Sequence, residues 1–347
     1  MIDLSKDKLP NITNGNTPKN YELCQEGDIA FADASEDTNE VAKAVEFYKL
    51  NGKAVICGLH TIHGRDNHQK TVVGYKGYAF SSMAFHHQIR RIAQGTKIYS
   101  INSKNFSECY IGIPSKEEQK KIATLLRLID ERIVTQNKII EDLKKLKSAI
   151  IEEHYRQTEK NEVCVADLGN HFNVGNLAKD DLSETGKPCI IYGELFTTYG
   201  EVISQIESHT NKTEGMILSK KGDLLFPSST TVDAVSLIAP SVINVDNVIL
   251  GGDMFGIHIS HNYNAQYLSY YFNHIAKKQL AKFAKGSTII HLHYTDIEKA
   301  KLLLPSLEEQ NRMAKCLVAL DKKVSVEQNL LSSLTFQKSY LLQQMFI

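Results

Sequence analysis

The chain has 347 residues, of which 42% are hydrophobic and 23% are charged, as in a globular protein with enough apolar material for real cores. Because a single core rarely grows past about 250 residues, this length favours two modules. The 40 lysines and arginines balance the 40 aspartates and glutamates, which excludes a strongly basic chain, so any case for nucleic-acid binding rests on local clusters of charge.

Residues 1–112 predict a first module, in which short apolar runs alternate with Gly, Asn, Asp and Ser, a pattern typical of strands joined by turns. The apolar periodicity from Met83 to Ala93 predicts a short helix that ends at Gly95. We therefore expect mixed α and β content. The predicted strands include Gly27–Phe31, Ala54–Cys57 and Val72–Tyr75.

Three features of this module suit contacts with DNA. The short helix carries basic side chains beside a Gly-Thr loop, a segment rich in histidine runs from Gly58 to Arg65, and a polar loop, Ala32–Asp37, follows the first strand. Each feature has an alternative interpretation. The helix face is simply solvated, the histidines are purely structural, and the loop reflects the ordinary sequence divergence of a surface loop. The candidate DNA-binding residues here are His60, His63, Arg65, His86, His87, Arg91, Thr96 and Lys97.

Residues 113–155 predict a long amphipathic helix that begins with Pro114-Ser115-Lys116-Glu117-Glu118-Gln119. Proline fits the first turn of a helix, serine can cap it, and acidic residues suit its positive end. A helix of roughly 40 residues is roughly 60 Å long, more than the core of one module needs, so we interpret it as a spacer. Its seven-residue apolar spacing assigns to helix pairing Ile122, Leu125, Ile129, Leu143, Leu146 and Ile150.

Residues 156–303 predict a second module, with strands at Cys189–Tyr192 and Val242–Val245. Its Gly222–Phe226 resembles Gly27–Phe31 at an offset of 195 residues, and Ile275–Ala284 predicts a short helix that ends at Gly286. Lysines replace the histidines of the first module, and the loop after Phe226 differs in its polar residues, as expected if each module reads a different base sequence. The DNA-binding candidates here are Lys212, Ser228, Ser229, Thr230, Thr231, Lys277, Lys278, Lys282, Lys285 and Ser287.

Residues 304–347 predict a second long helix, because Pro305-Ser306-Leu307-Glu308-Glu309-Gln310 repeats the first helix start at an offset of 191 residues. Polar residues interrupt both apolar stripes at matched places, Arg132 and Gln136 in the first and Lys323 and Glu327 in the second. Such a break can set the register of a paired coil, whereas two helices packed separately on their own modules are the alternative. The predicted pairing residues of this helix are Met313, Leu320, Leu334 and Leu341.

Motifs for catalysis and cofactor binding are missing from the sequence. There is no G-x-x-x-x-G-K-[ST], no G-x-G-x-x-G after a strand, no H-E-x-x-H and no G-x-S-x-G, and the thirteen histidines form no metal-ligand spacing. We therefore predict a protein that is not an enzyme and needs no cofactor or metal. The six cysteines lie far apart without a C-x-x-C pair, which indicates free thiols in a reducing compartment.

The first residues, Met1-Ile2-Asp3-Leu4-Ser5-Lys6-Asp7, have neither the basic start nor the apolar run of a signal peptide. No stretch approaches the roughly 20 apolar residues that span a bilayer. We therefore expect a cytoplasmic protein without membrane contact.

Four motifs taken together resemble a known family. They are Gly27-Asp28-Ile29, then Gly58-Leu59-His60-Thr61-Ile62, then Gly95-Thr96-Lys97-Ile98, and finally the doubled P-S-x-E-E-Q with its long helix. The whole is similar to the specificity subunit of type I restriction-modification systems. The resemblance implies an α+β fold with two mixed α/β target recognition domains, each followed by a long helix. The two helices would pair as an antiparallel coiled coil with pseudo-twofold symmetry.

The resemblance also implies function and partners. Each target recognition domain would read half of a split site on double-stranded DNA, and the helices would fix the gap between the halves. Two methyltransferase subunits would bind S-adenosylmethionine, and restriction subunits would use ATP and Mg²⁺ to translocate and cut DNA. The specificity subunit itself performs no chemistry, which agrees with the missing motifs.

The repeat is unequal. The stretch from the opening of the second module, Val163-Cys164-Val165-Ala166-Asp167-Leu168-Gly169, to Gly222-Asp223 is more than twice as long as the stretch that precedes Gly27. We therefore expect the first module to lack an N-terminal segment that the second module has, with self-association as one consequence. A nuclease or methyltransferase fused to such modules, and a coiled-coil assembly protein that does not read DNA, are the alternatives from other functional classes.

Overall fold

The computed structural model describes residues 1–12 and 21–346. The chain divides into two compact units, one made of Met1–Ile139 and Glu327–Ile347 and the other of Ile140–Val326. Each unit therefore contains one of the two predicted modules together with one part of each long helix. Among the described residues, no helix is long and apolar enough to cross a membrane.

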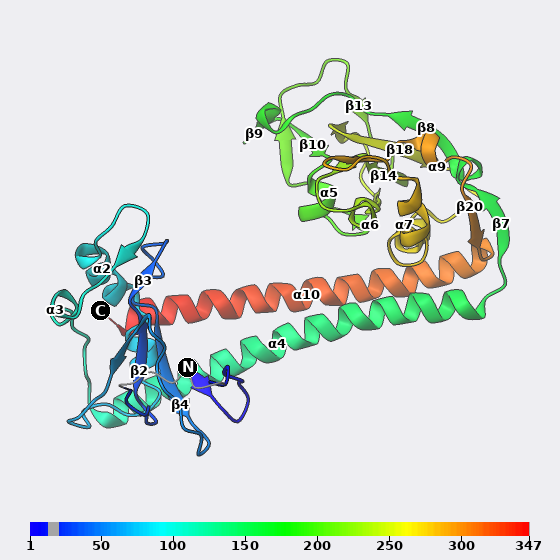
Figure 1. The fold of residues 1–347 in the computed structure, drawn as a ribbon. Coiled ribbons are helices and arrows are strands. Elements are labelled where there is room, and N and C mark those ends of the chain that lie inside the picture. The colour runs from blue at the N-terminus through cyan, green and yellow to red at the C-terminus, as the bar shows by residue number, and fades with distance from the viewer. Residues whose placement is uncertain (13–20, 347) are drawn as a thin grey trace. The chain divides into compact units, whose positions relative to one another are not determined.

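The first unit contains a four-stranded sheet with the strand order β1-β4-β2-β5 (Figure 1). β2 pairs antiparallel with β4 and β5, and β1 pairs parallel with β4. A separate two-stranded ribbon joins β3 to β6. The elements before the long helix are β1 (Ile2–Asp3), β2 (Ile29–Ala32), β3 (Ala34–Ser35), β4 (Ala44–Lys49), β5 (Thr61–Gly64), α1 (Lys76–Ala79), α2 (Met83–Ile92), β6 (Tyr99–Ser100) and α3 (Ser103–Phe106).

The core of the first unit forms where this sheet meets α2. Ile29 and Phe31 alternate with less buried residues on β2, as a half-buried strand requires, and they pack on Phe85 and Ile89 of α2. Ser82 caps α2, because its Oγ accepts a hydrogen bond from the Phe85 N–H at 3.3 Å. The short helix predicted at this place is therefore present.

Two predicted strands of the first unit do not form. In Ala54–Cys57 only Ile56 makes an isolated bridge, to Leu23. Val72–Tyr75 forms a turn, because Gly74 has a φ of +93° and donates its N–H to the buried Glu46 carboxylate at 2.8 Å. The left-handed backbone of this glycine interrupts the strand that the apolar letters suggested.

The second unit contains two five-stranded sheets, with strand orders β13-β17-β10-β12-β9 and β11-β16-β14-β18-β8, and two small ribbons, β15-β19 and β20-β7 (Figure 1). Its strands are β7 (Asn161–Cys164), β8 (Gly169–Asn173), β9 (Leu182–Ser183), β10 (Lys187–Ile191), β11 (Val202–Ile203), β12 (Ser208–Thr210), β13 (Ile217–Leu218), β14 (Asp223–Pro227), β15 (Ser229–Thr230), β16 (Ser241–Ile243), β17 (Ile249–Gly251), β18 (Met254–Ile259), β19 (Ile290–His291) and β20 (Lys301–Leu304). Its helices before the long one are η1 (Val165–Leu168), η2 (Lys179–Asp181), α5 (Glu194–Thr197), α6 (Ala234–Leu237), α7 (Ala265–His274), α8 (Lys277–Leu280), η3 (Ala281–Phe283) and α9 (Tyr294–Ile297).

The main core of the second unit contains the buried face of α7, a helix that the sequence analysis did not predict. Tyr267, Tyr271 and Phe272 are at most 1% exposed and pack among the apolar residues of β14 and β18. Beyond α7, the helix predicted over Ile275–Ala284 is broken into the short α-helix α8 and the 3-10 helix η3. The strands predicted around Cys189 and Val242 are present as β10 and β16.

Two long helices, α4 (Lys116–Gln157) and α10 (Leu307–Met345), pair antiparallel within each unit (Figure 1). In the first unit, Asp130 contacts Lys338 and Gln136 contacts Glu327. In the second unit, Lys147 contacts Asp321 and His154 contacts Glu309. Residue numbers rise along α4 as they fall along α10 in both sets of contacts, so the helices run in opposite directions.

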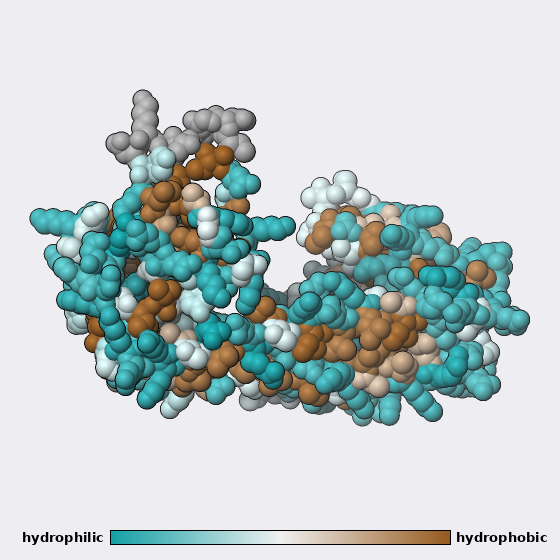
Figure 2. All heavy atoms as spheres, turned by 90° about the horizontal axis from the view of Figure 1, so that it is seen from below, coloured by the Kyte–Doolittle hydropathy of each residue, from teal (hydrophilic) through white to brown (hydrophobic). Residues whose placement is uncertain are grey.

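The buried seam between these helices agrees with the predicted one at Ile129 and Met313, each 7% exposed, and differs from it at Leu125 and Leu146. Leu125 and Leu146 are 42% and 47% exposed, whereas Leu126 and Lys147 are 0% and 8% exposed. At these two places the predicted set took the residue next to the buried one. Leu146 was selected because the buried position beside it is a lysine, which the apolar pattern does not select. Figure 2 shows apolar side chains exposed over the long helices. The buried seam residues are Leu126, Ile129, Gln136, Ile140 and Lys147 on α4, and Met313, Leu317, Val324 and Glu327 on α10.

The helix starts are built alike in the two units. The Oγ atoms of Ser115 and Ser306 each accept the N–H three residues later at 3.3 Å, which confirms both predicted caps. Gln119 and Gln310 correspond to each other at the 191-residue offset and are buried, 0% and 1% exposed. The carboxamide oxygen of Gln119 accepts the Val72 N–H, and that of Gln310 accepts the Asn264 N–H, both at 2.9 Å. Each glutamine thus fixes its own module to the start of its long helix.

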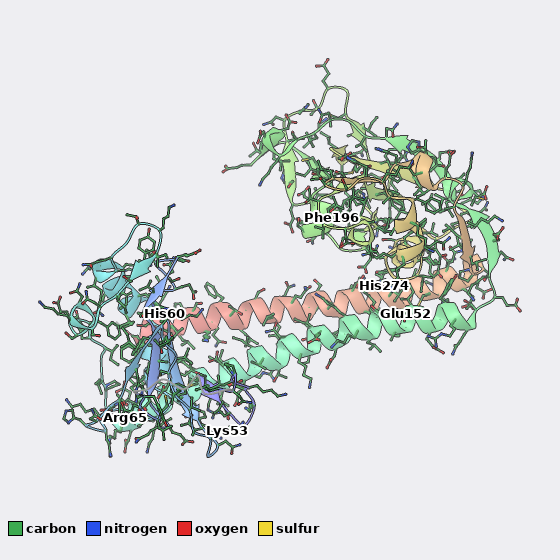
Figure 3. The ribbon with its side chains drawn as sticks, in the orientation of Figure 1. Lys53, His60, Arg65, Glu152, Phe196 and His274 are labelled. Carbon is green, nitrogen blue, oxygen red and sulfur yellow. The ribbon has the colours of Figure 1, made fainter. Side chains whose placement is uncertain are left out.

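A buried cluster of charges joins the second module to the helices. Lys147 Nζ lies 2.9 and 3.0 Å from the Glu201 carboxylate oxygens and 2.8 Å from Asp321 Oδ1. His274 of α7, labelled in Figure 3, contacts Glu201 at 2.9 Å and Ser148 at 3.3 Å. Burial alone would raise the pKa of Glu201, but the contacts with His274 and Lys147 outweigh it and lower the pKa to about 2.

Part of this cluster recurs in the first unit. Lys338 contacts Asp130 at 2.6 Å, and Tyr78 donates to the same carboxylate at 2.8 Å. These residues correspond to Lys147, Asp321 and Tyr270 at offsets of 191 or 192 residues. The charge contacts that join a module to the helices therefore repeat with the sequence, whereas Glu201 and His274 belong to the second unit alone.

Candidate nucleic-acid interface

A two-stranded ribbon in each unit brings together the two loops that the sequence analysis selected for contact with DNA. In the first unit β3 lies in the loop after β2, the strand that follows Gly27-Asp28. It pairs antiparallel with β6, which follows the loop at Gly95-Thr96. In the second unit β15 pairs with β19 in the same way. Two segments that lie far apart in the sequence therefore form one surface, once in each unit.

The loop at Gly95-Thr96 and the loop at Gly286-Ser287 are hairpins of the same construction. Backbone hydrogen bonds in both directions join Gln94 to Ser100 in one unit and Lys285 to His291 in the other, at 2.7 to 2.9 Å. Gly95 and Gly286 have φ values of +140° and +117°, and a Cβ atom there would lie 1.9 Å and 2.0 Å from a carbonyl oxygen across the loop. Only glycine fits these positions without strain.

The tips of both hairpins are exposed. Thr96 and Lys97 in the first unit and Ser287 in the second are exposed, and Ile98 and Ile289 are 61% and 50% exposed. Exposed hydroxyl, ammonium and branched apolar side chains can contact phosphates, base edges and the thymine methyl group. The hairpin tips therefore present side chains of all three kinds to solvent.

Replacing Gly286 by alanine should open the hairpin of the second unit. The positive φ and the clash with the Ile289 carbonyl oxygen should cost about 2 kcal/mol, so the Lys285 and His291 amide hydrogens should exchange faster by about 30-fold. Gly193→Ala is the matched control, because Gly193 has a φ of −61° and no atom within 4 Å of a Cβ. Equal exchange in the two variants would contradict the strained turn.

Lysines lie beside the ribbon of the second unit. Lys278 and Lys282 are exposed and Lys277 is half-buried on α8 and η3, which pack against α6, and α6 also contacts β15 and β19. Lys285 is exposed at the base of the hairpin but contacts Asp296 at 2.5 Å. These lysines give the second unit a cationic edge next to its hairpin, which suits contact with a phosphate backbone.

Two histidines that the sequence analysis did not select complete this surface. His291 and His293 stack with ring centroids 6.1 Å apart and line a hollow of about 510 Å³ together with Asp253, Lys285 and Asp296. The alternation Ile290-His291-Leu292-His293 after the Gly-Ser loop is the signal that could have found them, since Leu292 is buried and its neighbours face outward. Stacked imidazoles can donate hydrogen bonds to phosphates or bases.

The histidine-rich segment of the first unit is largely occupied by contacts within its own module. Arg65 contacts Asp28 and Glu22 and donates to the Leu23 carbonyl at 2.8 Å, and His63 lies 2.9 Å from Asp28. The side chain of His60, at the other end of β5, is 90% exposed (Figure 3). Of these three candidates only His60 is exposed enough to face DNA. His63 and Arg65 instead bind the carboxylate of Asp28. In the second unit the ring of His258 binds the matching carboxylate of Asp223, at 2.6 Å.

The helix candidates of the first unit face different surroundings. His86 is half-buried against Phe85, and burial together with the nearby Arg90 lowers its pKa, so this ring is neutral at pH 7. His87 and Arg91 are exposed, and they line a groove beside residues 110–114 rather than the hairpin tip. Thr96 and Lys97, by contrast, lie in the hairpin that leads into β6 of the ribbon.

The loop candidates of the second unit also separate. Ser228 and Ser229 are 4% and 6% exposed, and their backbone groups pair with those of Asp253, Leu292 and His291, so their side chains have no surface to offer to DNA. Thr230 is half-buried and Thr231 is exposed, next to Val232, which is 73% exposed. Lys212 lies in another loop, where it contacts Asp181 at 3.1 Å.

No cluster of His, Cys, Asp and Glu in the described ranges is arranged to hold a metal ion. The six cysteines are free thiols, with the Cys24 and Cys57 sulfur atoms 3.7 Å apart. Burial raises the pKa of Cys24 to about 12, so this thiol stays protonated at neutral pH.

A family model described as the type I restriction modification DNA specificity domain matches residues 9–145 and 158–335. The chain belongs to this family. The two matched ranges each contain one module with its ribbon, and they agree with the internal repeat. The family name that the sequence motifs suggested is therefore confirmed.

Individual relatives agree with the family. Two specificity subunits of Methanocaldococcus jannaschii, of the type I restriction enzyme MjaVIII and the putative enzyme MjaX, are 25% and 24% identical to this chain over 67% and 87% of its length. The chain spans 60% of the first of these relatives and 73% of the second. The solved type I restriction-modification S subunit of M. genitalium has the same fold, with a TM-score of 0.60 at 17% identity, over 97% of this chain and 87% of that chain.

Proposed function

We propose that this chain recognises a two-part sequence on double-stranded DNA and directs the methyltransferase and restriction subunits of a type I system to it. The observation that carries the proposal is the recurrence of the ribbon and its glycine hairpin in both units, with different side chains at the two tips. A chain with two similar readers that differ in their exposed residues suits a site with two different halves. The M. jannaschii relatives are named specificity subunits, which supports this role.

The chemistry belongs to the partners in this proposal. Two methyltransferase subunits bind S-adenosylmethionine and methylate the DNA, while restriction subunits use ATP and Mg²⁺, and all of them work with this chain in the cytoplasm. The specificity chain contributes contacts alone. Its lysines bind phosphates and set the position on the duplex, and the hairpin tips and the loops beside them read bases.

Removing the lysines of α8 and η3 should weaken DNA binding without changing sequence preference. If Lys278 and Lys282 each contact one phosphate, Lys278→Ala/Lys282→Ala should reduce the slope of log affinity against log salt by about 2 and the affinity by about 30-fold at about 0.15 M salt. The affinity of the chain bound to methyltransferase subunits is measured on duplexes with and without the target, by fluorescence anisotropy over a salt series.

The control variant is Lys220→Ala/Lys221→Ala, which removes the same charge from the turn before β14, at the end of that strand away from the ribbon. Its salt slope should change little. The target needed for this experiment comes from mapping methylated adenines in cells with and without the gene. Equal affinity of the complex for every sequence would refute the proposal, and an unchanged salt slope in the Lys278/Lys282 variant would move the phosphate contacts elsewhere.

A further inference from the structure

The two units differ at one strand edge. In the second unit β20 leads into α10 and pairs antiparallel with β7, with the register Lys301↔Cys164, Leu302↔Val163, Leu303↔Glu162 and Leu304↔Asn161. The segment of the first unit that corresponds to β20, at the 191-residue offset, is Tyr110–Ile113, which leads into α4. No described residue pairs with this segment as a strand.

One edge of residues 110–113 is held in the same way as β20. Gln88 donates to the Tyr110 carbonyl at 2.9 Å and accepts the Tyr110 N–H at 3.0 Å, and Gln279 donates to the Lys301 carbonyl at 2.6 Å. The Tyr75 hydroxyl donates to the Gly112 carbonyl at 2.8 Å. Residues 110 and 112 thus direct their backbone groups toward their own module.

The other edge is defined by the alternation of an antiparallel ladder. The Val165 N–H donates to the Ala300 carbonyl at 3.1 Å, so Ala300 and Val165 form a hydrogen-bonded pair. In an antiparallel ladder every second residue pair is hydrogen-bonded, so the pairs Leu302↔Val163 and Leu304↔Asn161 are hydrogen-bonded as well. The N–H and C=O groups of Leu302 and Leu304 therefore point toward β7. The matching residues of the first unit are Ile111 and Ile113. Their N–H and C=O groups make no hydrogen bond with any described residue.

The side chains of the unpaired edge are also less buried than those of β20. Leu302 and Leu304 are 0% and 2% exposed under their partner strand, whereas Ile111 is half-buried and Ile113 is 47% exposed. Beside this edge lies a groove of about 560 Å³, lined by apolar Tyr75, Ile111, Ile122 and Phe346 and by the basic Arg91. An open edge next to an apolar groove is the arrangement that binds an added strand.

We infer that the edge of residues 110–113 is a docking site for an extended segment of a partner polypeptide, which adds to it as an antiparallel strand. The occupant has the chemistry of β7, with a branched apolar residue such as Val163 opposite Ile111 and acidic residues such as Glu159 and Glu162 near it. Arg91, which lines the groove beside this edge, carries the opposite charge to those acids. The inference does not rest on the proposed function, because the edge carries none of the hairpin residues that are proposed to read bases.

The probe is a synthetic fluorescein-labelled peptide with the sequence of residues 158–166, Thr-Glu-Lys-Asn-Glu-Val-Cys-Val-Ala, in which serine replaces the cysteine. It should bind the full chain in fluorescence anisotropy titrations and slow the amide hydrogen exchange of Ile111 and Ile113 but not that of Gly112. N-methylation at the residues matching Asn161 and Val163 removes the donors that face the edge and should weaken binding by about tenfold or more.

The matched control peptide is N-methylated at the residues that match Glu162 and Ser in place of Cys164, whose N–H groups point away from the edge. It should bind like the unmodified peptide. All these changes are in the peptide, so the folding of the protein is unaffected. Absence of binding, equal weakening by both methylation patterns, or exchange protection outside residues 110–113 would each overturn the inference.

Discussion

Lys147→Ala should destabilise the second unit by about 4 kcal/mol, since removal of one partner from a buried ion pair leaves an uncompensated charge. The Lys147 side chain is 10% exposed and is the cation between Glu201 and Asp321, whose side chains are 17% and 29% exposed. Its loss leaves two carboxylates facing each other, with the His274 ring beside Glu201 and the Tyr270 hydroxyl beside Asp321. Urea unfolding followed by hydrogen exchange of the α7 amides measures the loss in this unit alone.

The matched control is Lys338→Ala in the first unit. Lys338 and Asp130 have the same relation to each other as Lys147 and Asp321, but their side chains are 30% and 34% exposed. Solvent screens such a pair, so the loss there should be about 1 kcal/mol or less. Similar losses in both units would mean that the burial of the cluster has no energetic weight.

The Lys147 variant should also change the dependence of stability on pH. The pKa of Glu201 is lowered to about 2 in the folded protein, against an ordinary value of 4.5. Its ionised form therefore stabilises the fold above about pH 4.5, and this contribution falls as pH decreases toward 2. In Lys147→Ala the loss of unfolding free energy between pH 5 and pH 3 should be smaller than in the wild type, because part of the stabilisation is already gone.

Leu126→Ala should cost about 3 kcal/mol in the first unit, whereas Leu125→Ala should cost less than about 0.5 kcal/mol. Leu126 is 0% exposed and packs on Tyr75, Tyr78 and Phe346, so its truncation leaves a cavity lined by large side chains. The neighbouring Leu125 is 42% exposed and leaves no cavity. Both residues have the same helix propensity, so their difference reports packing alone.

This pair of variants decides between the two assignments of the helix seam. The apolar spacing of the sequence selected Leu125, and the burial of side chains selects Leu126. The measurement is the urea midpoint and slope of each variant, followed by exchange of the α4 amides. A larger loss in the Leu125 variant would restore the seam that the sequence suggested.

Much of the architecture was readable from the sequence because it is local or repeated. The doubled helix start predicted the caps at Ser115 and Ser306, and the 191-residue offset predicted two equivalent modules. The predicted seam included the buried Ile129 and Met313 but took Leu146 in place of Lys147, because no count of apolar letters places a lysine in a buried seam. What buries it is Glu201, which lies 54 residues away in the sequence.

The candidate site was readable only in part, because its residues are selected by pairing between distant strands. The selected loops lie together, since β3 pairs with β6 and β15 with β19, and their contact with DNA stays a prediction. The sequence did not separate exposed candidates from those that are buried or bound within their own module. Arg65 has the residue type of a DNA contact but is bound by Asp28 and Glu22, and Ser228 is buried by the ribbon that its own backbone forms.

The glycine hairpins separate the residues that build the loop from those that face outward. The turn depends on Gly95 or Gly286 and on backbone bonds at its base, none of which uses a side chain of residues 96–98 or 287–289. Mutations at those tip positions therefore carry little folding cost, and the chemistry displayed there can change while the scaffold remains the same. A protein built in this way can acquire a new binding preference through few substitutions, without passing through unstable intermediates.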